Sequence, residues 1–298
     1  MSILIENISK SFGDVKALQQ ISFKVDTGGL FGLIGPDGAG KTTLFRILVT
    51  VLQADEGNAF VAGINVNDFK AVRKIVGYMP GRFSLYQDLS VEENLEFFAT
   101  VFGTTIKANY ELVRDSYVQL EPFKNRKAGQ LSGGMKQKLA LCCALIHRPK
   151  VLFLDEPTTG VDAVSRKEFW EMLKRIQKEN ITIMVSTPYM DEASLCDHVA
   201  LIQNGKIMQS GTPMEIKSGY PKKLYALRTQ NIYALQKTLE GFDELHSIHL
   251  FGDALHISTE QNFNQTKLIS YAHSNGFADI ELTPIEAGIE DCFLELMS

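Results

Sequence analysis

The sequence is short of cysteine, of long apolar runs and of positive charge. Its four cysteines form no CxxC pair, so no disulfide framework is indicated, and we expect small buried side chains in a reducing compartment. No apolar run approaches the ~18–20 residues that a membrane-spanning helix needs. Residues 1–7 lack the charged start and apolar stretch of a signal peptide. Any role at a membrane is therefore expected to depend on a partner.

The overall charge is slightly acidic. The formal net charge is −5 and the sequence pI is about 5.7, so broad electrostatic attraction to nucleic acid is not expected. Hydrophobic residues make up 45% and charged residues 22% of the 298 positions, which is typical of a globular protein. We therefore expect one large or two moderate domains and no nucleic-acid partner.

Short apolar runs alternate with helical patterns over most of the chain. Strands are expected over 3–8, 17–25, 30–35, 57–64, 75–79, 151–155, 181–186 and 198–202. Helices are expected over 41–52 and 165–179, and helical periodicity dominates from Ser90, a candidate N-cap, to about His147. This alternation predicts a parallel α/β sheet. Residues 1–217 are therefore assigned to one domain, with a helical subdomain at about 83–148.

The pattern changes after Ser218-Gly-Tyr-Pro221, a stretch of turn-forming residues. Six elements follow in the order strand, helix, strand, strand, helix, strand: 223–228, 233–240, 245–250, 254–258, 264–275 and 279–282. This is the order of the ferredoxin-like split motif, and a last amphipathic helix is expected over 289–297. Residues 222–298 are therefore predicted to form a small α+β accessory domain. Its role stays open between dimerisation, ligand sensing and restraint of the first domain.

A glycine-rich segment follows the apolar run at 30–35 and precedes a helical pattern. It fits G-x-x-x-x-G-K-[ST] in full and continues with a second threonine: Gly35, Pro36, Asp37, Gly38, Ala39, Gly40, Lys41, Thr42 and Thr43. In such a loop, backbone N–H groups and a helix N-terminus surround phosphate oxygens. Lys41 would reach the β- and γ-phosphates, and the Thr42 hydroxyl would hold Mg²⁺. The alternative, a chance glycine turn, does not explain the flanking strand and helix.

Two adjacent acids follow the apolar run that starts at Val151. At the carboxyl end of a strand beside a phosphate loop, Asp155 can hold Mg²⁺. Glu156 can orient or deprotonate the attacking water. An acidic pair after a strand is often only solvated surface, so this interpretation depends on the phosphate loop nearby.

A serine and two glycines precede a long helical pattern in the segment Leu131-Ser-Gly-Gly-Met-Lys-Gln137. Helix capping explains Ser132 but not the two glycines, because glycine weakens a helix start. Hydroxyl and N–H groups here can bind an anion. With this segment the chain resembles the ATP-binding cassette (ABC) transporter ATPases over about residues 2–217. The motifs are Walker A at 35–42, the signature at 131–137, Walker B at 151–156 and the D-loop at 157–162.

The resemblance implies an α/β fold, a P-loop (RecA-like) ABC ATPase core with an antiparallel β subdomain and an α-helical subdomain. ATP and Mg²⁺ are the implied cofactors, and the implied partner is a second ABC ATPase domain in a homodimer or a heterodimer. Each ATP would lie between one Walker A and the partner's signature residues: Ser132, Gly133, Gly134 and Gln137. Asp162 would act in the D-loop. Phe12 would stack on adenine; the alternative for Phe12 is a place in the core.

The C-terminal extension and the residues from Phe83 to Leu89 are similar to those of ABC-2-type exporter ATPases. This similarity implies ATP-driven transport, in the direction of export, through separate transmembrane permease subunits. Residues from Phe83 to about Phe102 would belong to the surface that meets the permease. The chain is then expected in the cytoplasm, peripheral on the inner face of the cell membrane.

Two positions depart from the family pattern. Gly81 stands where the family has the Q-loop glutamine, and Pro188 stands where it has the switch histidine. Gln87 lies six positions after the place of the missing glutamine, and His198 is interpreted as structural. Asp37 adds a charge near the phosphates. We therefore hypothesise that the site formed by this chain's own Walker motifs is impaired while its signature serves a partner; the alternative is a subfamily that hydrolyses ATP without these groups.

Two rival functions follow from the same residues. One is an ATP-gated regulatory subunit with negligible turnover, which the changes at Gly81 and Pro188 favour. The other is a soluble, non-transport ABC ATPase of translation or DNA repair. Such proteins usually carry two cassettes or a long coiled-coil insertion, and the sequence has neither.

Overall fold

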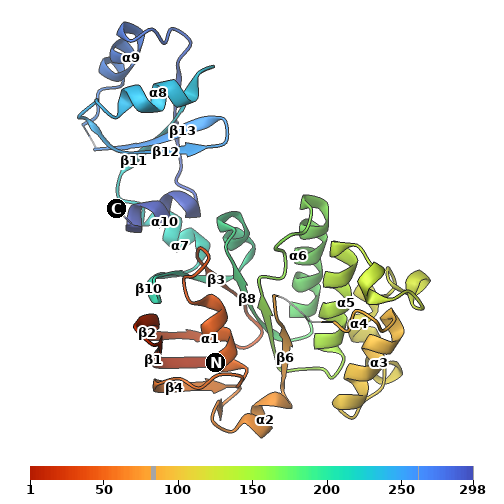
Figure 1. The fold of residues 1–298 in the computed structure, drawn as a ribbon. Helices are drawn as coiled ribbons and strands as arrows, with labels where there is room; N and C mark the ends of the chain where they lie inside the picture. Colours follow the sequence, from red (N-terminus) through yellow and green to blue (C-terminus); the bar gives the residue numbers. More distant parts are fainter. Residues whose placement is uncertain (82–84, 261, 298) are drawn as a thin grey trace. The chain divides into compact units, whose positions relative to one another are not determined.

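The computed structural model describes residues 1–81, 85–260 and 262–297. The chain divides into two compact units, Met1–Pro213 and Met214–Ser298 (Figure 1). Helix α7 (Pro213–Ser218) lies at this division. Phe83 and Ser84, which begin the expected helical subdomain and permease surface, lie outside the described residues.

The first unit contains an antiparallel sheet in the order β2-β1-β4-β5. Its strands are β1 (Ile3–Phe12), β2 (Val15–Val25), β4 (Glu56–Val61) and β5 (Ile64–Asn65). The single strand expected over 57–64 is wrong, because Ala62 and Gly63 take positive φ values of 49° and 79° and make a turn between β4 and β5. Apolar side chains of β1, including Ile3, Ile5 and Ile8, are fully buried.

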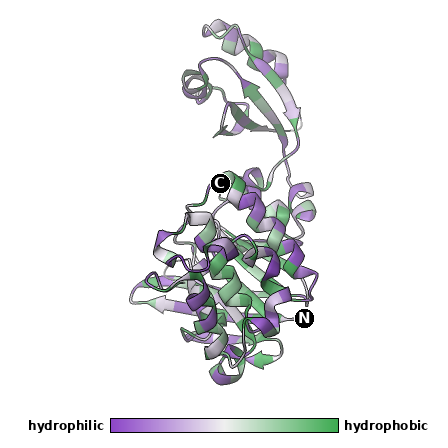
Figure 2. Cartoon of the chain, turned by 90° about the vertical axis from the view of Figure 1, so that its right-hand side faces the viewer, coloured by the Kyte–Doolittle hydropathy of each residue, from purple (hydrophilic) through white to green (hydrophobic). Residues whose placement is uncertain are grey.

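The second sheet of this unit has the order β10-β9-β3-β8-β7-β6. Its strands are β3 (Leu30–Ile34), β6 (Val76–Met79), β7 (Val151–Asp155), β8 (Thr182–Thr187), β9 (His198–Gln203) and β10 (Lys206–Gly211). All pairs are parallel except β9 with β10. Every residue of β3 and β7 is buried, as expected for a sheet covered on both faces. Figure 2 shows hydrophobic residues concentrated in these central strands.

Helices of the first unit cover this sheet and extend beyond its β6 edge. They are α1 (Lys41–Leu48), α2 (Phe69–Arg73), α3 (Val91–Val101), α4 (Tyr110–Tyr117), α5 (Gly133–Leu145) and α6 (Ala163–Gln177). The expected N-cap at Ser90 is confirmed: Ser90 Oγ accepts from the Glu93 N–H at 3.1 Å, and Glu93 Oε2 accepts from the Ser90 N–H at 2.7 Å. This reciprocal pair forms a capping box that starts α3.

The second unit has a four-stranded antiparallel sheet in the order β12-β13-β11-β14. Its elements are β11 (Lys223–Arg228), α8 (Ile232–Leu239), β12 (Leu245–Phe251), β13 (Ala254–Thr259), α9 (Gln265–Ser274), β14 (Glu281–Ile285) and α10 (Ile289–Met297). Side chains such as Leu227, Leu235 and Leu255 form its core. The expected ferredoxin-like order of elements is therefore present.

Among the residues that the structure describes, no helix has both the length and the apolar character needed to span a lipid bilayer.

Candidate nucleotide-binding site

Four neighbouring parallel strands bring the predicted motifs to one edge of the main sheet. The P-loop follows β3, and Ile34 pairs with Thr187 of β8. Asp155 at the end of β7 pairs with Ser186, while Met79 near the end of β6 pairs with Leu154. Because these strands all run in the same direction, their carboxyl ends form a common edge, which is where open α/β sheets bind ligands.

The P-loop passes close to other backbone segments, and this explains its glycines. A Cβ atom on Gly35 would lie 2.1 Å from the Ile202 carbonyl oxygen. Gly40 has φ +107°, and a Cβ atom there would lie 2.5 Å from the Ala17 carbonyl oxygen. Only glycine fits both positions. The loop leads into the N-terminus of α1, where backbone N–H groups without helical partners favour the binding of an anion.

Lys41 lies at the centre of this edge and is only 3% exposed. Its Nζ donates to the carbonyl oxygens of Gly35 at 2.7 Å and Pro36 at 2.9 Å. It also pairs with Glu156 Oε1 at 3.1 Å. The two residues predicted to act on phosphate and on water are therefore in direct contact.

Asp155 is buried, and one of its carboxylate oxygens accepts hydrogen bonds from two hydroxyl groups. Thr42 Oγ1 donates to Asp155 Oδ1 at 3.2 Å, and Ser186 Oγ donates to the same atom at 2.6 Å. The two residues predicted to bind the metal, Thr42 and Asp155, therefore lie together. Ser186 was missed by sequence reasoning; the only signal was a polar Ser-Thr pair closing an apolar strand.

Glu156 has a left-handed backbone, with φ +50°. Its N–H donates to the backbone oxygen of Ser186 at 3.0 Å and to Ser186 Oγ at 3.0 Å. A non-glycine residue in this region costs roughly 1–3 kcal/mol and is often found at functional sites. The unusual turn directs the carboxylate toward Lys41 instead of along the strand.

Two cavities flank the P-loop and share Thr42 and Glu156. One, of about 480 Å³, is lined by Asp37, Thr42, Arg46, Tyr78, Pro80, Gly81, Asp155, Glu156 and Thr159. The other, of about 350 Å³, is lined by Val15, Lys16, Ala17, Gln19, Gly38, Gly40, Lys41, Thr42, Thr43, Glu156 and Asn204. Arg46, Tyr78 and Thr159 were not predicted. Burial and the Asp155 charge raise the pKa of Tyr78 to about 12, so its hydroxyl stays protonated.

Phe12 lies beside the second cavity and is 51% exposed. It pairs across the hairpin with Val15, which lines that cavity. Lys10 Nζ is 5.7 Å from the ring centroid. The alternative interpretation of Phe12 as a core residue is therefore wrong, and the ring is free to stack on a planar ligand.

The signature residues start helix α5. Ser132 Oγ accepts from the Met135 N–H at 3.3 Å, and Ser132 and Gly133 are exposed. A Cβ atom on Gly134 would lie 2.7 Å from Ser165 Oγ of α6, so this glycine has a packing role. Within the described chain, none of the four signature residues, Gln137 included, lines either cavity beside the P-loop.

Asp162 caps the N-terminus of α6. Its Oδ1 accepts from the N–H groups of Val164 at 3.1 Å and Ser165 at 3.0 Å. Hydrogen bonds from Ser165 and Val164 lower the pKa of Asp162 below its usual value. The D-loop and the signature therefore meet at Ser165.

The two departures from the family pattern lie at this same edge. Gly81 lines the 480 Å³ cavity, and a Cβ atom on it would lie 3.0 Å from the Asp155 carbonyl oxygen. Pro188 directly follows Thr187 at the end of β8. Gln87 donates through Nε2 to Leu85 O at 3.4 Å and faces Gly129. His198 is exposed and pairs with Phe31, toward the other end of the sheet. Neither side chain lines either cavity described above.

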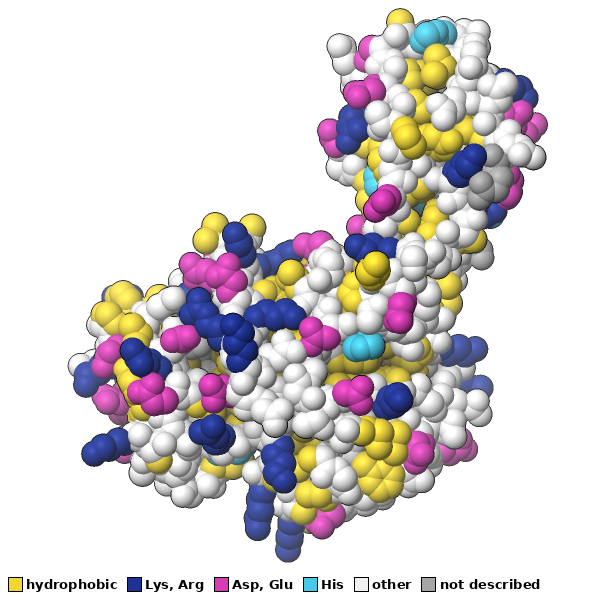
Figure 3. Space-filling model, turned by 180° about the vertical axis from the view of Figure 1, so that it is seen from behind, with side chains coloured by type: hydrophobic (Ala, Val, Ile, Leu, Met, Phe, Trp, Pro, Cys, Tyr) yellow, Lys and Arg dark blue, Asp and Glu magenta, His cyan; other side chains and the backbone are white. Residues whose placement is uncertain are grey.

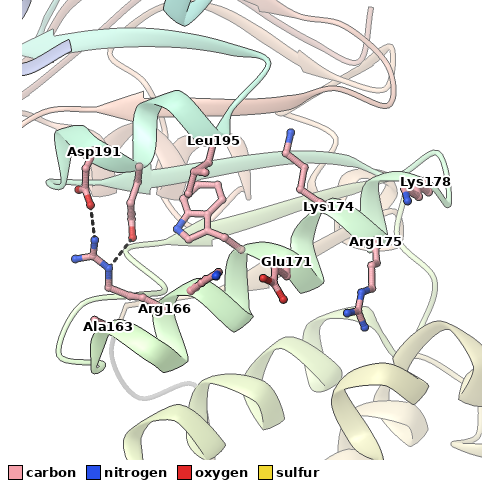
Figure 4. Close-up of a pocket in the computed structure, with 11 residues that line it drawn as sticks. Ala163, Arg166, Glu171, Lys174, Arg175, Lys178, Asp191 and Leu195 are labelled. Carbon is pink, nitrogen blue, oxygen red and sulfur yellow. Dashed lines mark hydrogen bonds and ion pairs between the residues drawn. The ribbon is translucent and has the colours of Figure 1, made fainter. Parts of the chain in front are cut away.

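A third cavity, of about 580 Å³, runs along α6 and the 3-10 helix η4 (Met190–Leu195). Figure 4 shows its charged side chains, with Arg166 paired to Asp191 at 2.6 Å. Two other cations are paired, Lys174 with Asp197 and Arg175 with Asp115. The face of this unit seen in Figure 3 carries a similar mixture of basic and acidic side chains. None of the predicted nucleotide or signature residues lines this cavity.

Fold and site together define a P-loop nucleotide-binding cassette, with a phosphate loop after β3 and paired acids after β7. A sequence profile of the ABC transporter family matches residues 18–159. The chain is 40% identical over 216 residues to the probable multidrug ABC transporter ATP-binding protein YbhF of Escherichia coli K12, covering 72% of this chain and 37% of that protein. It is 39% identical to the Nod factor export ATP-binding protein I of Burkholderia lata, covering 70% and 69%. The chain therefore belongs to the ABC transporter family.

Solved structures agree with this fold. An ATP-binding subunit of an ABC transporter superposes with a TM-score of 0.67 at 24% identity, covering 74% of this chain and 93% of that one. A dimeric post-hydrolysis cassette bound to ADP and Pi superposes with a TM-score of 0.64 at 22% identity, covering 70% and 98%. The expected P-loop ABC fold is thus confirmed. The chain spans only 37% of the length of the first relative.

Proposed function

We propose that this chain is the ATP-binding and ATP-hydrolysing subunit of an ABC transporter, and that it drives export through separate membrane subunits. One observation carries the proposal: the side chains needed for phosphate binding and hydrolysis meet at one sheet edge, namely Lys41, Thr42, Asp155 and Glu156. Export is supported by the names of the relatives, which include a Nod factor export protein. The soluble non-transport alternative has no such support.

The residues fit ATP with Mg²⁺. Thr42 Oγ1 and Asp155 Oδ1 lie 3.2 Å apart and offer the oxygen ligands that Mg²⁺ prefers. Bound there, the ion would neutralise charge on the transferring phosphoryl group. Lys41 would leave the carbonyl oxygens of Gly35 and Pro36 to hold the β- and γ-phosphates. Glu156 would accept a proton from the attacking water.

A second cassette, either another copy of this chain or a related ATPase domain, completes the site in this proposal. Ser132 and Gly133 are exposed at the start of α5 yet line no cavity beside the P-loop in the described chain. Their hydroxyl and N–H groups are therefore available to the γ-phosphate of ATP held by a partner. ATP binding would close the pair, and hydrolysis would reopen it.

An apolar groove of about 310 Å³ supports a membrane partner. It lies between the end of α1, β6 and the helices α3 and α5, and its hydrophobic lining includes Val49, Val51, Val76, Phe98, Val101 and Phe102. Val51 and Val101 are more than 60% exposed, as expected of a surface that a partner covers. We assign this groove to a helix of the permease, which would place the chain on the cytoplasmic face of the membrane.

Restoring the two missing groups tests whether the site is impaired. Pro188→His with Gly81→Gln is expected to raise turnover by about 10²–10³-fold, by analogy with the loss of one transition-state donor. The Gly81 change needs a small shift, because a Cβ atom there lies 3.0 Å from Asp155 O, so Pro188→His alone is measured too. Unchanged turnover in the assembled complex would favour a subfamily that works without these groups.

The first experiment is steady-state Mg-ATP hydrolysis by the purified chain, with Lys41→Ala as the blank. Hydrolysis that depends on Lys41 supports the proposed motor. ATP binding without Lys41-dependent hydrolysis, alone or with a partner ATPase, would instead favour an ATP-gated regulatory subunit, which the changes at Gly81 and Pro188 make the second candidate.

A further inference from the structure

We propose that Ser186 is a positioning residue for ATP hydrolysis, because one hydroxyl group holds both catalytic acids. Its Oγ donates to Asp155 Oδ1 at 2.6 Å and accepts from the Glu156 N–H at 3.0 Å. A hydroxyl can donate once and accept as well, so a single side chain satisfies both contacts. The inference rests on the proposed function and extends it to a residue outside the recognised motifs.

The position of Ser186 in the sheet makes these contacts possible. Ser186 pairs with Asp155 across β8 and β7, and it is fully buried. Among the described side chains of β8, it alone hydrogen-bonds to the two acids. Pro188, two residues later, has no side-chain hydrogen-bonding group, so Ser186 provides the side-chain link between β8 and the hydrolytic residues.

Each contact has a separate consequence. The bond to Asp155 Oδ1, together with the one from Thr42 Oγ1, restrains the rotation of the carboxylate that would hold Mg²⁺ with Thr42. The bond to the Glu156 N–H helps to hold a backbone with φ +50°, which keeps the Glu156 carboxylate 3.1 Å from Lys41 Nζ. Loss of the hydroxyl should therefore disturb metal use and turnover more than ATP binding.

Ser186→Ala tests the inference, with Ser186→Thr as the conservative variant. We expect kcat to fall by about 10- to 100-fold, the range for a lost hydrogen bond to a charged group. KM for ATP should change little, and half-maximal activity should need more Mg²⁺. Ser186→Thr keeps the hydroxyl and should recover most of both properties. Wild-type kcat and Mg²⁺ dependence in Ser186→Ala would overturn the inference.

Ser116→Ala is the matched control. Ser116 is also buried, at 4% exposure, but its Oγ donates to Met172 Sδ at 3.1 Å, away from the acids. Ser116→Ala should change Tm but not the Mg²⁺ dependence of activity. An equal loss of kcat in both alanine variants would mean that Ser186 has only a structural role. If the wild-type chain does not hydrolyse ATP either alone or with a partner ATPase, the proposed function fails, and the inference is tested by binding. The gain in ATP affinity on adding Mg²⁺ should then be smaller in Ser186→Ala, and an unchanged gain would refute it.

Discussion

Glu156→Gln is expected to lower ATP turnover by about 10²–10⁴-fold, the usual contribution of a general base, while ATP still binds. The carboxylate borders both cavities beside the P-loop, where it can accept a proton from water that attacks the terminal phosphate. Glutamine has nearly the same shape but cannot accept that proton. It also removes the charge that holds Lys41 at 3.1 Å, so affinity for ATP should be equal or higher.

Single-turnover hydrolysis and equilibrium ATP binding measure the two effects separately. Glu171→Gln is the matched control, because Glu171 is exposed on α6 and lines neither of those cavities; its turnover should equal that of the wild type. Turnover within a few-fold of the wild type in Glu156→Gln would mean that another group activates the water. Full transport by Glu156→Gln would mean that ATP binding alone drives the cycle, as in an ATP-gated regulatory subunit.

The local parts of the site could be predicted because contiguous residues encode them. The P-loop spans only Gly35 to Thr43, and its geometry depends on glycines that the sequence displays directly. The acids after Val151 are likewise marked by the apolar strand before them. In the second unit, the strand at 223–228 and the helix at 289–297 were predicted at the observed bounds, since clear turn residues precede both.

The parts that were missed depend on contacts between distant segments. Ser186 meets Asp155 only because β7 and β8 pair in one particular register across 31 positions. The packing role of Gly134 appears only when Ser165 of α6 lies against it. No local pattern contains this information. Strand β10 was missed for a local reason instead: its residues Lys206–Gly211 alternate between exposed and half-buried positions with few apolar side chains.

An ion pair with one buried member joins the segment after Pro188 to the helix after the D-loop. Glu192 is 1% exposed, and neither of its carboxylate oxygens has a hydrogen-bond partner within the described chain. Its charge partner is Arg166 of α6, whose Nε lies 3.4 Å from Glu192 Oε1. The same guanidinium pairs with Asp191 at 2.6 Å (Figure 4). It also lies 4.5 Å from the ring centroid of Tyr189.

Arg166→Met is therefore expected to reduce the free energy of unfolding of the first unit by about 3 kcal/mol, because it leaves a buried carboxylate without a partner. Arg175→Met is the matched control on the same helix: its pair with Asp115 is 58% exposed on both sides, and such surface pairs contribute less than about 1 kcal/mol. Thermal unfolding monitored by Trp170, the one tryptophan of the chain, measures both variants.

The double variant Arg166→Met with Glu192→Gln separates charge from packing. If the cost comes from the unpaired carboxylate, the second change should recover most of the stability lost in Arg166→Met. If the double variant is no more stable than Arg166→Met, the loss comes from the contact of the guanidinium with Tyr189. Equal unfolding temperatures for Arg166→Met and Arg175→Met would contradict both explanations.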